Sequence, residues 1–391
     1  MLKLTSFIFA TNQFILDTMQ IEINRKEFIS ALNVGGSMAG RVKTIPILED
    51  VKITIKGTSA VISSFDNETA ITKRTYIVSS TEDAMFCINP RNLVNILKTI
   101  KDENVSLYVV DNVCTVVHSK GEATLPVEPA IDFPSPTKEA DAQVVTLPCE
   151  GLFEWFKRAK SFVASGEKAD LRPVLGGIYF YVQNGEVGVA SSDSFKFFHD
   201  RMQVDELSNV VVDSLITPKS IDAILEVING NETVDVSFGK KSIVFKVADA
   251  MVMSRLIEGA YPKFKVVFDR PYPIEVKIGR EEFAESVSRA TLSANMASML
   301  LKLTIAYGKI MIDSEDLFAQ RKTHEEVACE VEGGSLEIGF KGSSLTDCLN
   351  TMDGETLVVS FNDHKSPAMF KESDGSAKAA VCLPMLMASN K

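Results

Sequence analysis

The chain has 391 residues, of which 45% are hydrophobic and 24% are charged, and its net charge at pH 7 is −11. This composition is typical of a globular protein with room for two to four domains. No run approaches the roughly 18 consecutive apolar residues of a membrane span, so no membrane contact is expected. The acidic balance argues against a surface that is basic throughout, although a local basic patch can exist inside an acidic shell.

Residues 1–18 precede the first regular pattern. Asn12 and Gln13 interrupt their apolar stretch and no small-residue cleavage site follows, which argues against a secretory signal. The first alternating strand begins at Met19. We therefore expect residues 1–18 to be an extension outside the core.

From Met19 onward, one plan of strand, short amphipathic helix and hairpin repeats six times, with a period of roughly 60–68 residues. The helices are expected to begin near Arg25, Arg91, Glu150, Lys219, Arg280 and Lys341. Each carries an apolar i, i+4 pair: Phe28/Leu32, Leu93/Leu97, Leu152/Phe156, Ile221/Leu225, Phe283/Val287 and Leu345/Leu349. The strands that precede them are predicted over Gln20–Asn24, Ala84–Asn89, Gln143–Leu147, Val210–Ile216, Pro273–Ile278 and Ser335–Phe340.

Alternating runs with tight-turn signals follow the helices and predict antiparallel hairpins. The runs cover 105–117, 178–190, 233–247, 301–312 and 356–371, with turns at Asp111-Asn112, Asn184-Gly185, Gly239, Gly308 and Asn362-Asp363. Proline clusters near residue 138 and near residue 270 mark two linkers. The expected fold is α+β, with three similar domains over residues 19–140, 141–270 and 271–391, each holding two copies of the strand–helix–antiparallel-strand unit.

A search for catalytic motifs finds none: there is no nucleotide-binding glycine loop, no HExxH and no GxSxG. The four histidines are isolated from one another, and the acidic pairs lack further oxygen ligands. The six cysteines form no CxxC pair and fall mostly within apolar runs, which favours buried free thiols in a reducing cytoplasm. We therefore expect no catalytic residue, no metal and no cofactor, in a protein that is not an enzyme.

Cations cluster on several of the predicted helices and in the glycine-rich loop 35–43. Singly, each cluster is more often solvated surface than a nucleic-acid contact. Repeated on equivalent helices of a curved array, they could follow phosphates without reading bases. The cations expected to face DNA are Arg41, Lys43, Lys157, Arg158, Lys160, Arg172 and Lys219.

Several segments together resemble the bacterial β sliding clamp, the processivity ring of the replicative DNA polymerase. They are 172–178 (Arg-Pro-Val-Leu-Gly-Gly-Ile), 256–264 (Leu-Ile-Glu-Gly-Ala-Tyr-Pro-Lys-Phe), 44–48, 132–134 and the tail 381–385 (Val-Cys-Leu-Pro-Met). The resemblance runs from Met19 to about Met387. It implies the DNA clamp fold, closed into a ring by a head-to-tail homodimer with Leu125 and Leu292 at the subunit junction. It also implies a cytoplasmic clamp that encircles duplex DNA without reading its sequence, with a replicative polymerase, a clamp loader and other clamp-motif proteins as partners.

The same resemblance implies a hydrophobic cleft that receives a short polymerase peptide of the Gln-x-x-Leu-Phe kind. The matching positions are Leu175, Ser192, Ser194, Phe195, Lys196, Phe197, Pro262, Val267, Pro367, Val381, Cys382, Leu383, Pro384 and Met385. Phe195 and Lys196 stand where the family commonly has His and Arg, which is expected to alter the rim of the cleft. Two other readings stay open on the residues alone: a non-DNA repeat scaffold built from the same unit, and an enzyme with a site between domains.

Overall fold

The computed structural model describes residues 19–136, 139–268 and 270–387. The predicted extension at residues 1–18 lies outside them. The described chain divides into two compact units, one within residues 19–150 and 222–255 and the other within residues 151–221 and 256–387. Each unit is built around one large sheet in which every described strand pair is antiparallel.

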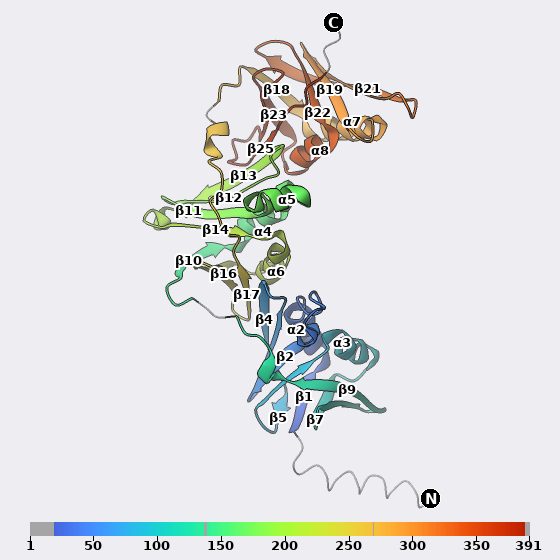
Figure 1. Cartoon of the computed structure of the whole chain (residues 1–391), viewed down its shortest axis with the longest axis vertical. Helices are drawn as coiled ribbons and strands as arrows, with labels where there is room; N and C mark the ends of the chain where they lie inside the picture. The colour runs from blue at the N-terminus through green and yellow to red at the C-terminus, as the bar shows by residue number, and fades with distance from the viewer. Residues whose placement is uncertain (1–18, 137–138, 269, 388–391) are drawn as a thin grey trace, which may run out of the picture. The chain divides into compact units, whose positions relative to one another are not determined.

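The sheet of the first unit has thirteen strands, in the order β10-β15-β16-β17-β4-β3-β2-β6-β9-β8-β7-β1-β5. Their bounds are β1 (Met19–Asn24), β2 (Val51–Lys56), β3 (Ser59–Phe65), β4 (Thr69–Tyr76), β5 (Ser79–Ser80), β6 (Ala84–Ile88), β7 (Asn104–Val110), β8 (Val113–His118), β9 (Gly121–Pro129), β10 (Gln143–Pro148), β15 (Thr233–Phe238), β16 (Ser242–Lys246) and β17 (Ala250–Arg255). Helices α2 (Arg25–Gly35) and α3 (Pro90–Thr99) pack on it side by side (Figure 1).

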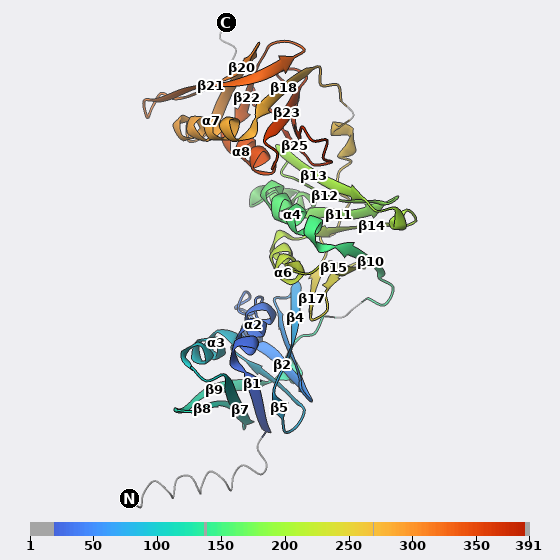
Figure 2. The same cartoon turned by 180° about the vertical axis from the view of Figure 1, so that it is seen from behind.

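The sheet of the second unit has twelve strands, in the order β14-β11-β12-β13-β25-β24-β23-β18-β21-β20-β19-β22. Their bounds are β11 (Ile178–Gln183), β12 (Glu186–Ser192), β13 (Lys196–Gln203), β14 (Val211–Ile216), β18 (Ile274–Gly279), β19 (Leu300–Ala306), β20 (Lys309–Asp316), β21 (Arg321–Glu332), β22 (Leu336–Lys341), β23 (Thr356–Phe361), β24 (Ala368–Glu372) and β25 (Ala379–Cys382). Its helices include α5 (Glu167–Leu171), α7 (Arg280–Ser293) and α8 (Gly342–Asn350), and α7 and α8 pack against each other (Figure 2).

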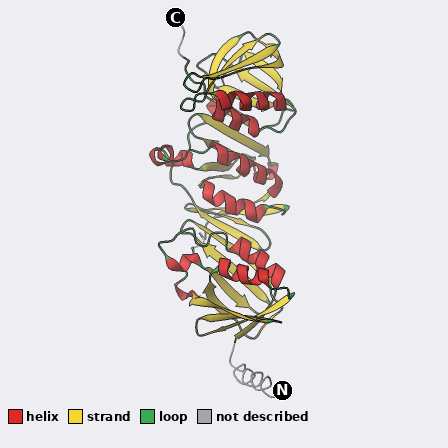
Figure 3. Ribbon diagram, turned by 90° about the vertical axis from the view of Figure 1, so that its right-hand side faces the viewer, coloured by secondary structure: helices red, strands yellow, loops and turns green. Residues whose placement is uncertain are grey.

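Two helices begin in one unit and end in the other: α4 (Cys149–Ala159) and α6 (Pro218–Ile228). Short 3-10 turns are η2 (Pro46–Glu49), η3 (Ala130–Asp132), η4 (Lys160–Phe162), η5 (Pro173–Gly176), η6 (Asp205–Leu207) and η7 (Lys265–Val267). Figure 3 shows helices and strands along the whole described chain, which is the α+β character that the sequence predicted. No helix of the described residues is long and apolar enough to cross a membrane.

Local chemistry explains where the helices start. The Asn24 side chain accepts hydrogen bonds from the amides of Lys26 (3.1 Å) and Glu27 (3.2 Å), and so caps α2. The Asn89 side chain caps α3 in the same way, and Pro90 occupies the first helical position, where no amide hydrogen is needed. All six predicted strands and helix starts agree with the observed ones to within one residue, and these two caps account for the starts of α2 and α3.

The structure corrects two predictions and adds elements that were not predicted, among them strands β2–β4, β9, β13, β17 and β21. On α6 the predicted apolar pair is only partly buried, because Ile221, Ile224 and Ile228 are buried while Leu225 is half-buried. The predicted tight turn at Asn362-Asp363 is wrong, because a six-residue loop, 362–367, joins β23 to β24. Helix α5 was not predicted, and its five residues are too few for a periodic apolar face. The cysteines are free as predicted, and five of the six are buried.

Candidate functional site

The tail of the chain forms a strand beside the segment that carries Phe195 and Lys196. Strand β13 pairs with β25, with Lys196 opposite Cys382 and Phe197 opposite Val381. The pairing extends by one bond, in which the amide of Leu383 donates to the carbonyl oxygen of Phe195 (2.8 Å). Two predicted segments that lie about 190 residues apart in sequence are therefore neighbours in one sheet.

One face of this sheet carries an apolar cluster. Phe197 and Val381 pack there with Ala190 and Met369. Residues 261–268, called the interdomain segment below, cover them. The half-buried residues of the cluster are Tyr179, Tyr261, Phe264, Val267, Phe268 and Tyr272. The cluster joins three of the predicted cleft residues: Phe197, Val267 and Val381.

A series of buried polar contacts lies beside this apolar cluster. The hydroxyl of Tyr181 contacts Glu186 Oε1 (2.7 Å) and His199 Nε2 (2.8 Å). Because the phenol donates to the carboxylate, it accepts from a neutral imidazole. Burial, reinforced by the charge of Arg201, lowers the pKa of His199 to about 3. Gly188 makes room for this arrangement, since a Cβ there would lie 2.6 Å from the Tyr181 hydroxyl.

A pocket of about 340 Å³ lies along the interdomain segment. Four aromatic residues line it, Tyr179, Tyr181, Tyr261 and Phe264, and Tyr179 stacks on Tyr261 with ring centroids 5.0 Å apart. Pro262 is the predicted cleft residue that lines it. The pocket thus opens next to the apolar cluster rather than at its centre.

The two residues that depart from the family pattern have different environments. Phe195 is exposed (51%), and the ammonium of Lys168 lies 4.2 Å from its ring centroid. Lys196 is buried, forms an ion pair with Asp347 and donates to the carbonyl of Ser161. The charged end of Lys196 therefore faces Asp347 and the carbonyl of Ser161 rather than solvent.

The remaining predicted cleft residues are spread around this sheet. The Ser192 hydroxyl donates to the carbonyl of Lys196 (2.8 Å) and accepts from the amide of Ser194, which shapes the β12–β13 turn. The amide of Met385 donates to Gly339 of β22 (2.8 Å), and Leu383 is 40% exposed. Leu175 in η5 and Pro367 before β24 are buried, and Pro384 is half-buried. The apolar cluster as described does not include these three.

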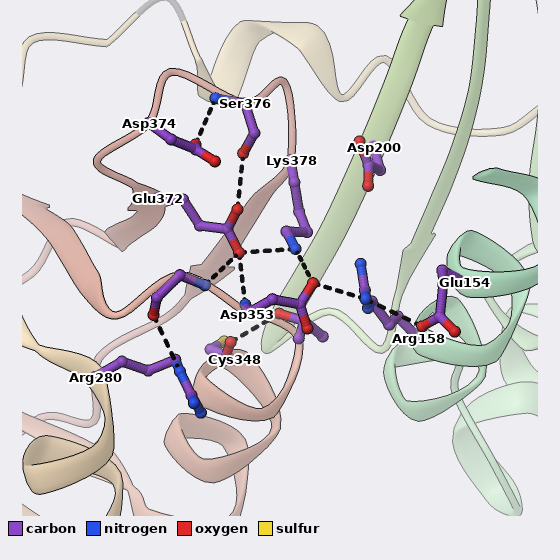
Figure 4. Close-up of polar contacts among 12 residues, drawn as sticks. Glu154, Arg158, Asp200, Arg280, Cys348, Asp353, Glu372, Asp374, Ser376 and Lys378 are labelled. Atoms are coloured by element: carbon purple, nitrogen blue, oxygen red, sulfur yellow. Dashed lines mark hydrogen bonds and ion pairs between the residues drawn. The ribbon is translucent and has the colours of Figure 1, made fainter. Parts of the chain in front are cut away.

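An ionic cluster ties α4 to the C-terminal part of the second unit (Figure 4). Arg158 binds Glu154 (3.0 Å) and Asp353 (2.7 Å), and Lys378 binds Asp353 (2.6 Å) and Glu372 (2.8 Å). Burial alone would raise the pKa of Glu372, but hydrogen bonds from Lys378 and from two backbone amides outweigh it and lower that pKa to about 2. Asp200 lies nearby without a drawn contact (Figure 4), and burial raises its pKa to about 6.

This cluster changes the reading of one expected DNA contact. The side chain of Arg158 is only 16% exposed and is held by two carboxylates. Arg158 is therefore not among the cations proposed to contact DNA. Arg41, Lys43, Lys157 and Arg172 are exposed. Lys160 and Lys219 are half-buried and have partners of their own.

Two strands change partner halfway along. Strand β9 pairs with β8 over 121–126 and with β6 over 127–129, and β21 pairs with β20 over 321–328 and with β18 over 329–332. Residues 121–126 and 321–328 therefore each have one side that no strand of the described residues covers. Leu125 on the first edge packs partly on the core, and Leu292 beside the second is 73% exposed. Open edges of this length are natural sites for pairing with another chain.

The missed residues of the site are mainly aromatic. Tyr179 and Tyr181 alternate along β11, and Tyr261, Phe264 and Phe268 recur along the interdomain segment. Alternation of large aromatic residues on a strand was a usable signal for a covered sheet face. The ionic cluster had no sequence signal, because its members come from four separate segments.

Comparison with known proteins agrees with this architecture. Three family models match: the N-terminal domain of the DNA polymerase III beta subunit at residues 19–137, its central domain at 146–263 and its C-terminal domain at 265–386. The beta sliding clamp of Staphylococcus aureus is 25% identical over 380 residues, which cover 94% of this chain and 99% of that protein. Among solved structures, a sliding clamp from Pseudomonas aeruginosa bound to griselimycin has a TM-score of 0.90 at 22% identity. The superposed region covers 95% of this chain and 100% of the Pseudomonas chain. The Bacillus subtilis clamp has a TM-score of 0.89 at 20% identity, with 95% of this chain and all of that chain covered.

Repeated α+β units built on antiparallel sheets give this chain the DNA clamp fold. The chain belongs to the DNA polymerase III beta subunit family, the beta sliding clamps. It is accordingly a non-catalytic processivity subunit of DNA replication.

Proposed function

We propose that two copies of this chain close head to tail into a ring around duplex DNA. The observation that carries the proposal is the pair of open edges, β9 over 121–126 and β21 over 321–328. Two copies can form two such junctions, each joining the β9 edge of one copy to the β21 edge of the other. Together the two junctions close a ring. Leu125 and Leu292 would then be buried at each of the two junctions.

The ring would hold DNA by topology rather than by sequence. Arg41, Lys43, Lys157 and Arg172, together with the half-buried Lys160 and Lys219, are the cations proposed to contact phosphates. Contacts to phosphates carry no sequence information and weaken with salt, which suits a protein that slides. A clamp loader would open the ring on DNA, and the site of action would be the cytoplasm.

The proposed site for the polymerase and other clamp-motif proteins is the surface around Phe195 and Leu383, next to the buried Phe197. Exposed apolar side chains lie there beside an aromatic cluster and a pocket. A surface of this kind suits a peptide with adjacent leucine and phenylalanine anchors.

Retention on circular DNA tests the encircling mechanism. The protein, with a clamp loader, is expected to co-elute with nicked circular DNA and to dissociate when one cut linearises the circle. A protein that stays on the linear DNA at the same salt concentration binds by surface contact, and the ring proposal would then be wrong.

A further inference from the structure

The hairpin between β20 and β21 presents large apolar side chains that nothing in the described chain covers. At its tip, Phe318 is 96% exposed and Leu317 is 76% exposed. The hairpin extends beside α7 in both views (Figures 1 and 2). Leu292 near the end of α7 and Met296 just after it are 73% and 84% exposed. Clusters of exposed apolar side chains of this size mark interaction surfaces.

The tip is built to hold this shape. The buried carboxylate of Asp316 accepts hydrogen bonds from the amides of Phe318 (3.1 Å) and Ala319 (3.0 Å) and forms an ion pair with Arg321 (3.3 Å). Arg321 also donates to the carbonyl of Leu292 (3.2 Å), and the Thr323 hydroxyl donates to the hydroxyl oxygen of Ser293 (2.6 Å). The hairpin tip and the end of α7 therefore form one connected surface, and an ordered turn reduces the entropy lost on binding.

We propose that Phe318 and Leu317 extend the subunit junction and that their partner is a second copy of this chain, at the end of its β9 strand. This inference rests on the proposed ring. Arg321 lies beside Leu292, so the start of β21 would face the region of Leu125 on the partner copy. If β21 of one copy pairs antiparallel with β9 of the other, the residues that precede Arg321 lie opposite the residues that follow Leu125 of the second copy.

The surface expected there is apolar as well. Pro126 follows Leu125 and pairs with Val113, and Val113 and Val110 are 41% and 44% exposed on either side of the β7–β8 turn. Asp111 and Asn112 form that turn with positive φ angles of 45° and 65°, as a tight hairpin turn requires. Val113 lies on the side of β9 that β8 covers, so Phe318 of one copy would reach over the end of β9 to cover the exposed valines of the other.

The same domain supplies a matched control. Tyr307 is also 96% exposed, but it sits in the β19–β20 turn, at the opposite end of β20 from Phe318. Phe318→Ala is expected to weaken the dimer about 30-fold, as the loss of an interface aromatic anchor does, and Tyr307→Ala is expected to leave it unchanged. Sedimentation velocity over a concentration series gives the dissociation constants, and an unchanged melting temperature shows that both variants fold.

Three outcomes are informative. Equal dissociation constants for Phe318→Ala and the unsubstituted protein would overturn this inference while leaving the ring intact. An equal loss in both variants would also overturn it, since the effect would not depend on position. An unsubstituted protein that stays monomeric at micromolar concentration would instead contradict the ring itself. A short bismaleimide linker should join a Phe318→Cys chain to a Val113→Cys chain, and a Tyr307→Cys chain should not be joined.

Discussion

Two apolar regions of the second unit differ in whether residues of the same chain cover them. Around Phe197, the interdomain segment folds back over the sheet, and aromatic rings, Tyr181 and a neutral His199 fill the space within one chain. At the β20–β21 tip, Leu317 and Phe318 stand uncovered on an ordered turn. The first region is covered by residues of its own chain, whereas the second is the one that we propose a second copy covers. Stability and assembly should therefore respond to different substitutions.

The largest effect is expected on stability, from breaking the ionic cluster. Glu372→Ala leaves Lys378 buried without one of its partners, which costs about 3–5 kcal/mol of unfolding free energy. Urea unfolding of the second unit would measure it. Glu315→Ala, at an exposed position on β20, is the control and should change the free energy by less than about 0.5 kcal/mol. Equal effects in the two variants would show that the cluster adds little.

The next effect is expected on assembly alone. Leu292→Asp buries an unpaired charge at the proposed junction and should weaken the dimer by about 100-fold or more. Light scattering would give the mass, and the melting temperature of the monomer should hardly change, because Leu292 is 73% exposed in the chain. A dimer of full strength in this variant would place the junction elsewhere.

A pH series sharpens the comparison from the covered side. His199 has a folded pKa of about 3 against 6.5 when free, so the unfolded chain binds the extra proton and stability falls as pH drops below 6.5 toward 3. The slope approaches about 1.4 kcal/mol per pH unit. His199→Phe should remove this slope. Asp200, with its pKa raised to about 6, acts in the opposite sense between pH 3.8 and 6 in both proteins, so the difference between them isolates His199. Parallel curves would mean that His199 becomes charged in the folded state.

Peptide binding should depend on the exposed rim of the covered region. Leu383→Ala and Phe195→Ala are each expected to weaken a Gln-x-x-Leu-Phe peptide by about tenfold, since each removes an apolar contact worth about 1–2 kcal/mol. Fluorescence anisotropy with a labelled peptide gives the affinity. Leu317→Ala, on the hairpin tip, should bind normally, and unchanged affinity in the two rim variants would exclude this surface as the partner site.

The smallest effect is expected from single cations. Lys157→Ala or Lys43→Ala should each lower the salt dependence of DNA retention by about one unit of slope and should not alter the dimer. Arg158→Met should instead lower stability, because Arg158 is held by Glu154 and Asp353. If Arg158→Met lowers DNA retention and leaves stability unchanged, Arg158 contacts DNA and its ion pairs do not stabilise the fold.

The sequence alone determined the local elements. Strand alternation, the caps at Asn24 and Asn89 and the turn residues Asn184 and Gly185 act over a few residues, so they can be read along the chain. The residues of the predicted cleft, Phe197 and Val381 among them, came from likeness to a family and not from the pattern itself, and only the structure shows that these two residues pair across β13 and β25.

Only the tertiary structure decided how these elements combine. It divides the strands of residues 141–270 between two sheets, it places Lys196 against Asp347 and Arg158 against Asp353, and it leaves Phe318 uncovered. The reason is physical: the partner of a charge or an open strand edge is fixed by packing between segments far apart in sequence, whereas a helix cap or a turn depends on its immediate neighbours.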